Sequence, residues 1–159
     1  MTLVILGTQD KTFERLLKAV EKQIKLGNLK GDVIVQAGST KYESKCMKIF
    51  DYISMEKFDE YIKEADLVIA HGGVGTILSS VRKNKKVIAV PRLSKYKEHE
   101  NDHQLEIVSE FTKRGYIIPC YDLKKLDESI KKAKEFEPKK YRSNNRKMLN
   151  IIENYIDNL

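Results

Sequence analysis

Residues 67–76 read LVIAHGGVGT: four apolar residues and a histidine, followed by a turn that contains three glycines. Consecutive apolar positions are typical of a strand buried on both faces of a parallel sheet. Glycines between such a strand and a following helix permit a tight turn and a close approach of the backbone to a ligand. The amides that open the helix have no internal acceptors and lie at the positive end of its dipole, so they form a site for a diphosphate. A tight turn that binds nothing is the alternative.

The same alternation of short apolar runs and helical periodicity continues along the chain. The predicted strands are 2–7, 32–37, 67–71, 86–91 and 116–120. The predicted helices are 13–24, 58–65, one after the glycine turn, 102–113, 123–136 and 141–159. This order indicates βαβ units, and therefore an α/β fold with a doubly wound, mostly parallel sheet. We expect one domain over 1–159 that ends in a C-terminal helix.

Two further turns of small residues follow predicted strands. Gly7-Thr8 ends the first, and Gly38-Ser39-Thr40 ends the second. Ligands of open α/β sheets bind outside the carboxyl ends of the strands, which is where all three turns would meet. The glycine turn at 72–76 has neither the Gly-Lys-Ser/Thr end of a Walker loop nor the Gly-x-Gly-x-x-Gly dinucleotide pattern, so NTP hydrolysis and NAD chemistry are disfavoured.

Composition limits the class of protein. The 159 residues are 41% hydrophobic and 33% charged, as in ordinary globular domains. No apolar run approaches the ~20 residues of a membrane-spanning helix. We expect no secretory leader. We also expect the two cysteines to be free thiols, as in a reducing compartment such as the cytoplasm. The net charge of +7 favours phosphate-bearing partners without choosing between nucleic acid, an anionic membrane and a charged ligand.

Residues 99–104, HENDHQ, allow two interpretations. His-Glu-x-x-His within a helix is the zinc metalloprotease motif. Asn101 or Asp102, however, has the character of a helix N-cap, which would leave His99 outside the helix. The other interpretation is a sugar-binding segment, because amide, carboxylate and imidazole groups at a helix start supply the donors and acceptors that hydroxyls require. A capped surface helix with no ligand remains a third possibility.

Several segments in order carry a family resemblance. They are Val4-Ile5-Leu6 with Gly7-Thr8-Gln9, Gln36-Ala37-Gly38-Ser39, the turn at 71–76, Val90-Pro91-Arg92 and Asn101-Asp102-His103-Gln104. Together they resemble the C-terminal domain of family 28 glycosyltransferases, the Rossmann-like half of a GT-B enzyme. More narrowly, the chain is similar to the small separate half of split enzymes: the eukaryotic subunit that adds the second N-acetylglucosamine to dolichol-linked sugar, and bacterial counterparts in capsule and exopolysaccharide assembly.

The resemblance implies roles for named residues. The UDP diphosphate would bind at Gly72, Gly73, Gly75 and Thr76, and the sugar at His103 and Gln104. Gly7 and Thr8 match a turn near the cleft, while Arg92 and Asn101 match its rim. Many relatives bind the ribose hydroxyls with a glutamate where this chain has Ser79, which could make one such hydrogen bond.

The resemblance also implies the reaction and the partners. A hexose or N-acetylhexosamine would pass from a UDP-sugar to a lipid-linked saccharide, with a membrane-anchored partner subunit and no nucleic acid. The chain would then be cytoplasmic and peripheral at the inner face of the membrane through that partner. Without a paired acidic motif, we predict neither a catalytic metal nor another cofactor. The alternatives are a non-catalytic nucleotide-sugar-binding regulatory subunit and a small zinc metalloprotease.

Overall fold

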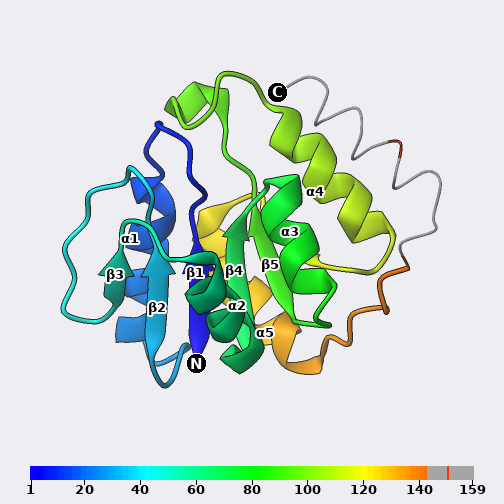
Figure 1. Ribbon diagram of the computed structural model, residues 1–159, viewed down its shortest axis with the longest axis horizontal. Helices are drawn as coiled ribbons and strands as arrows, with labels where there is room; N and C mark the ends of the chain where they lie inside the picture. The colour runs from blue at the N-terminus through cyan, green and yellow to red at the C-terminus, as the bar shows by residue number, and fades with distance from the viewer. Residues whose placement is uncertain (143–149, 151–159) are drawn as a thin grey trace.

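A parallel sheet forms the middle layer of the protein (Figure 1). The computed structural model describes residues 1–142 and residue 150. Within them, six strands pair in the order β3-β2-β1-β4-β5-β6, all parallel. The strands are β1 Thr2–Ile5, β2 Val33–Gln36, β3 Lys48–Phe50, β4 Leu67–His71, β5 Val87–Val90 and β6 Ile118–Pro119.

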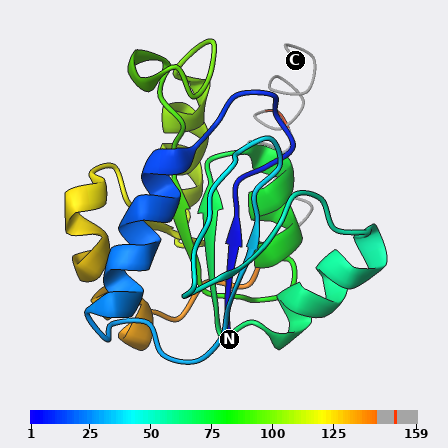
Figure 2. The ribbon, with the colours of Figure 1, turned by 90° about the vertical axis from the view of Figure 1, so that its left-hand side faces the viewer.

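Helices cover both faces of the sheet. They are α1 Glu14–Lys25, α2 Met55–Glu64, α3 Val74–Val81, α4 His103–Lys113 and α5 Leu126–Glu135, with 3-10 turns η1 Ser94–Tyr96 and η2 Leu123–Lys125. One core cluster joins α1 and α5 to one face, and a second joins α2, α3 and α4 to the other. Figure 2 shows α1 on one side of the sheet and α2 and α3 on the opposite side. Because both faces are covered, β1, β2, β4 and β5 are buried at every position.

The strand order places a topological switch in the middle of the sheet. The chain builds outward from β1 to β2 and β3, and then from β4 to β5 and β6. β1 and β4 are paired in register, with Ile5 opposite Ala70. The connections leaving their carboxyl ends diverge, and this is where open α/β sheets form a ligand crevice.

The doubly wound α/β prediction is confirmed, with three differences in detail. β3 was not predicted. The helix expected over 123–136 is a 3-10 turn followed by α5, and the strand expected over 116–120 is only the two residues of β6. The predicted helix over 141–159 falls almost entirely outside the described residues. Among the helices that the structure describes, none has the length and apolar character to cross a membrane.

Candidate functional site

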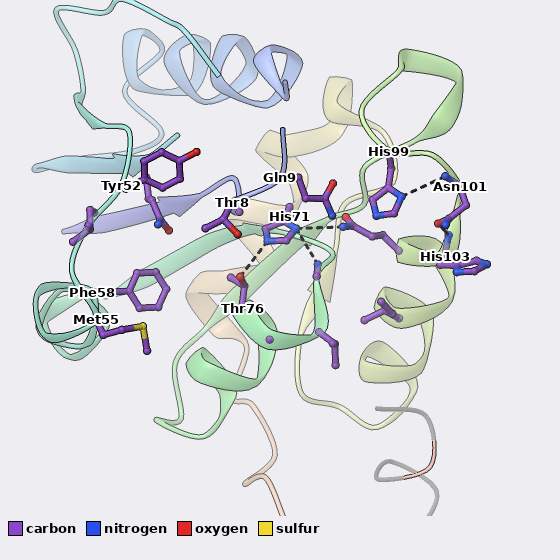
Figure 3. A pocket seen from close by; sticks show the side chains of 18 residues that line it. Thr8, Gln9, Tyr52, Met55, Phe58, His71, Thr76, His99, Asn101 and His103 are labelled. Carbon is purple, nitrogen blue, oxygen red and sulfur yellow. Dashed lines mark hydrogen bonds between the residues drawn. The ribbon is translucent and has the colours of Figure 1, made fainter. Parts of the chain in front are cut away.

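The carboxyl ends of β1 and β4 open into a cavity of about 470 Å³ (Figure 3). Its walls come from the turns after these two strands, the segment between β3 and α2, and the starts of α2 and α4. A volume of this order holds a small organic ligand. Of the residues predicted to bind substrate, those lining the cavity are Gly7, Thr8, Gly73, Gly75, Thr76, Asn101, His103 and Gln104. The three predicted residues outside the lining are Gly72, Ser79 and Arg92.

The glycine turn delivers the start of α3 to the cavity wall. Gly73 is the N-cap, and the first helical bond runs from the amide of Ile77 to the carbonyl of Gly73 at 3.1 Å. The amides of Val74, Gly75 and Thr76 therefore have no intrahelical acceptor. All three residues line the cavity, so the positive end of the helix dipole lies at the cavity wall.

The amides of the first two glycines are already bonded within the protein. Gly72 donates to Oε1 of Gln104 at 2.9 Å, and Gly73 donates to Nδ1 of His71 at 3.1 Å. Both had been predicted to bind the diphosphate. In this structure the amides available to an anion begin one residue later, at Val74.

The bonds around His71 determine its tautomer. Nδ1 accepts from the amide of Gly73 and lies 3.3 Å from Nε2 of Gln104, so it carries no proton. Nε2 then carries the proton and donates to Oγ1 of Thr76 at 3.1 Å. The ring is buried, and the pKa of His71 is lowered to about 3. Burial is the larger cause, and the positive charge of Arg92 is the second. His71 is therefore neutral at physiological pH and leaves the Thr76 hydroxyl free to donate its own proton to a ligand.

Gln104 supports the site more than it faces a ligand. Only 3% of the residue is exposed, and Oε1 accepts from the amides of Gly72 and Arg92, both at 2.9 Å. With Nε2 directed at His71, at most one N–H remains for the sugar contact that the sequence predicted. The side chain ties the glycine turn to the end of β5 and holds the imidazole in place.

Arg92 is corrected from the cleft rim to the interior. It is 1% exposed, and its guanidinium donates to the carbonyls of Leu6, Lys11 and Glu98 at 2.5, 2.9 and 2.9 Å. Burial lowers its pKa to about 10, so it keeps its charge. The cation satisfies backbone oxygens of the loops that follow β1 and β5, and therefore fixes those loops without reaching the cavity.

The carboxylate of Glu98 holds the same loop from another direction. It forms two bonds of 2.9 Å with the guanidinium of Arg15 on α1, and Oε1 also accepts from the amide of Leu93 at 3.1 Å. The side chain of Glu98 is 4% exposed and that of Arg15 is 24% exposed. The pair joins the loop after β5 to α1.

Ser79 is also corrected. It lies outside the cavity lining, and its hydroxyl donates to the carbonyl of Gly75 at 2.9 Å, one turn back along α3. This bond within the helix uses the proton with which Ser79 was expected to bind the ribose.

The segment at 99–104 does not form a metalloprotease site. α4 begins at His103 with Asp102 as its N-cap, so His99 precedes the helix. Asn101 accepts the amide of His103 through Oδ1 at 3.0 Å, and its own amide donates to Nδ1 of His99. Within residues 1–142 and residue 150, no three histidine, cysteine or acidic side chains are grouped as metal ligands. The pKa of His99 is lowered, mainly by burial and to a smaller extent by the positive charge of Arg92.

An apolar wall opposite the polar residues was missed by the sequence interpretation. Tyr52 and Ile53 line the cavity from the segment between β3 and α2, and Met55 and Phe58 line it from the start of α2. Tyr52 is 60% exposed and Met55 is 77% exposed, both at the side of the cavity away from α4 (Figure 3). Exposed apolar groups at a cavity mouth indicate a surface for a flat or apolar ligand part. The sequence feature that could have indicated this wall is Tyr52, but it follows β3, a strand that the sequence analysis did not predict.

Sequence comparisons find one family over the whole chain. Residues 1–159 match the model of the glycosyltransferase family 28 C-terminal domain. Three curated relatives are each described as UDP-N-acetylglucosamine transferase subunit ALG13. The protein of Candida albicans is 29% identical over 100 residues, covering 63% of this chain and 32% of the relative. That of Saccharomyces cerevisiae is 33% identical over 75 residues, covering 46% and 35%, and the human protein is 32% identical over 91 residues, covering 57% and 7%. The matches thus span about a third of the yeast relatives' length and far less of the human protein.

Solved structures share the fold at low sequence identity. The NMR solution structure of ALG13 superposes with a TM-score of 0.61 at 20% identity, covering 95% of this chain and 93% of that one. The calicheamicin glycosyltransferase CalG4 gives 0.59 at 14% identity, and Acinetobacter baumannii MurG gives 0.53 at 14%. This chain covers 33% and 45% of those two enzymes, and they cover 83% and 85% of it.

Proposed function

Since the chain belongs to the glycosyltransferase family 28 C-terminal domain family, we propose that it binds the UDP-sugar donor of a glycosyltransferase in the cavity at the start of α3. One observation carries the proposal. The amides of Val74, Gly75 and Thr76 and the proton of the Thr76 hydroxyl have no acceptor among the described residues, and these three residues line a cavity whose opposite wall is apolar. A nucleoside diphosphate has the same two parts, an anion and a flat base.

The diphosphate would bind at the start of α3. Its oxygens would accept from the three amides and from the Thr76 hydroxyl, aided by the helix dipole. The base would lie against Tyr52, Met55 and Phe58 across the cavity. The sugar would then point towards Asn101 and His103, which line the cavity at the start of α4.

The reaction that fits this arrangement is direct transfer. An acceptor hydroxyl oxygen forms a bond to the anomeric carbon, the bond from that carbon to the phosphate oxygen breaks, and UDP departs with the electron pair. Amides fixed at the start of α3 stabilise the negative charge that develops on the leaving oxygen. His71 is not the base that takes the acceptor proton, because Nδ1 already accepts and Nε2 already donates within the protein.

We further propose a lipid-linked saccharide as the acceptor, a membrane-anchored partner subunit and a place at the cytoplasmic face of the membrane, in polysaccharide synthesis. The word subunit in the names of the relatives supports the partner, as does the share of the larger enzymes that the chain covers. The donor sugar would be a hexose or N-acetylhexosamine. N-acetylglucosamine, the sugar in the relatives' names, is the first to test.

The test is calorimetric titration of the protein with UDP, UDP-sugars and ADP. Gly75→Val is the substitution to use, because a side chain there meets nothing within 4 Å and would enter the cavity beside the amides. Gly73→Val is unsuitable, since its Cβ would collide with Cε1 of His71 and disturb the fold. We expect uridine ligands to bind in preference to ADP, and Gly75→Val to abolish that binding with the thermal unfolding midpoint preserved.

Thr76→Val provides a graded variant. Loss of one hydroxyl bond to a charged ligand weakens binding by about 1.5–3 kcal/mol, or roughly 10- to 150-fold in affinity. Unchanged UDP binding in both Gly75→Val and Thr76→Val would overturn the proposed site. A regulatory subunit would bind UDP-sugar equally well, so transfer is then measured with the co-expressed partner. Loss of transfer in Thr76→Val that persists when UDP-sugar saturates the variant, with the complex intact, would argue against the regulatory alternative.

A further inference from the structure

A second cavity, of about 440 Å³, lies at the opposite end of α4 from the proposed donor site. It is lined by Arg114, Tyr116, Lys139, Lys140 and Arg142. Arg114 directly follows α4, whose first residue lies at the donor cavity. Eleven helical residues separate the two ends by about 16 Å, so a ligand here would not touch the donor.

The cavity is built from two segments that are held together. Lys139 donates its amide to the carbonyl of Gly115 at 3.0 Å, which fixes the chain after α5 against the turn between α4 and β6. The rings of Tyr116 and Tyr141 pack with centroids 5.6 Å apart, and the guanidinium of Arg82 lies 5.7 Å from the Tyr141 ring centroid. In Figure 1 the chain after α5 is the orange coil beside the lower end of α4. The concave surface is therefore part of the packed fold.

Four of its five lining residues are cations, and none is neutralised by the part of the chain that the structure describes. The ion pairs of that part involve neither Arg114 nor Arg142, Lys139 or Lys140. The Nε atom of Arg114 is also enclosed without a hydrogen-bond partner among the described residues. The rest of the half-buried guanidinium also has no acceptor among the described residues, so its positive charge is left for an anion in the cavity.

We propose that this cavity is a second anion site that takes a phosphate group, carried by a free phosphate ester or by a lipid headgroup. A phosphate offers several oxygens at once, which match the planar donor fork of an arginine and the ammonium groups of two lysines. Cations converging on a concavity favour such a compact anion over the extended backbone of a nucleic acid, which is bound along stripes. The site is independent of sugar transfer and of the donor cavity.

The first experiment is an NMR titration of the ¹⁵N-labelled chain with inorganic phosphate, in which the amides of the donor cavity at 74–76 are followed separately. We expect amide shifts at 114–116 and 139–142. The double variant Lys139→Gln, Lys140→Gln should weaken binding by about five-fold for each cation removed. Lys131→Gln, Lys132→Gln is the matched control, because it removes two exposed cations from α5 outside the cavity and should bind like the wild type.

A second arm distinguishes the source of the phosphate. Sedimentation with phosphatidylglycerol vesicles, against neutral phosphatidylcholine vesicles, measures headgroup binding in the same three proteins. Vesicle binding that the 139/140 variant loses and the control keeps would identify a lipid headgroup, whereas NMR shifts without vesicle binding would identify a soluble phosphate ester. The proposal is overturned if neither probe binds at these residues, or if the control pair loses as much affinity as the 139/140 pair. UDP binding measured in parallel shows whether the donor site is intact, so the two proposals can fail separately.

Discussion

The neutral state of His71 makes a quantitative prediction about pH and stability. Burial and the charge of Arg92 lower its pKa to about 3 in the folded protein, against about 6.5 in an unfolded chain. Between these two values the unfolded state binds a proton that the folded state refuses, so stability rises with pH. The contribution is fully present above about pH 6.5 and is lost as the pH falls towards 3. Each pH unit within that window changes the free energy of unfolding by roughly 1.4 kcal/mol.

His71→Asn removes this titration and keeps part of the geometry. The amide oxygen of asparagine can take the place of Nδ1 as the acceptor for Gly73, while the bond to Thr76 is lost. The variant should be less stable at pH 7 because of that lost bond. Its free energy of unfolding should then fall less on acidification: between pH 7 and pH 4 the wild type should lose about 3 kcal/mol more than the variant.

Urea unfolding followed by circular dichroism at pH 7, 5.5 and 4 measures the difference, since the chain has no tryptophan. His99 and the carboxyl groups titrate in both proteins and cancel in the comparison. Parallel plots of stability against pH for the two proteins would refute the reasoning, because they would mean that folded His71 takes up its proton at an ordinary pH. An imidazole NMR titration of the wild type, assigned by the missing signal in His71→Asn, gives an independent reading of the pKa.

Two further substitutions test the supports of the site. Gly72→Ala should lower the free energy of unfolding by about 1–3 kcal/mol, since its Cβ would lie 2.9 Å from side-chain atoms of α4. Gly75→Ala, with open space around the new Cβ, should be neutral or stabilising by up to about 1 kcal/mol. Equal melting temperatures for the two variants would contradict this pair of predictions. Glu98→Gln should destabilise by about 2 kcal/mol in urea unfolding, because the pair with Arg15 is only partly open to water. Glu60→Gln, in an exposed pair, is its control and should change stability by less than about 0.5 kcal/mol.

The sheet was predictable where strands carry their own signal. β1, β2, β4 and β5 are continuous apolar runs, because helices cover both faces and every position must be buried. β3 has no such signal. It is three residues at the edge of the sheet, with Lys48 and Phe50 exposed, and it exists through its pairing with β2. Short edge strands depend on tertiary context more than on local sequence. Because β3 was not predicted, the apolar wall that follows it was not predicted either.

The location of the proposed donor cavity could be expected from the sequence, whereas the direction of its polar side chains could not. Turns of small residues at parallel strand ends indicated the edge of the sheet where the cavity lies, and eight of the eleven residues predicted for the site line that cavity. Arg92, Gln104 and the amides of two glycines, however, direct their hydrogen-bonding groups into the protein.

The physical reason lies in the backbone groups that such a site exposes. Loops leaving the carboxyl ends of strands have amides and carbonyls that no sheet ladder satisfies, and those that become buried need partners. The carbonyls of Leu6 and Lys11 accept hydrogen bonds from the guanidinium of Arg92, and the amide of Gly72 donates to Oε1 of Gln104. A guanidinium that binds carbonyls and one that binds phosphate have the same chemistry, as do an amide that holds a glycine turn and one that binds a sugar hydroxyl. Sequence can therefore indicate that polar residues gather at a site, but only their burial and bonding partners separate those that hold the site from those that touch the ligand.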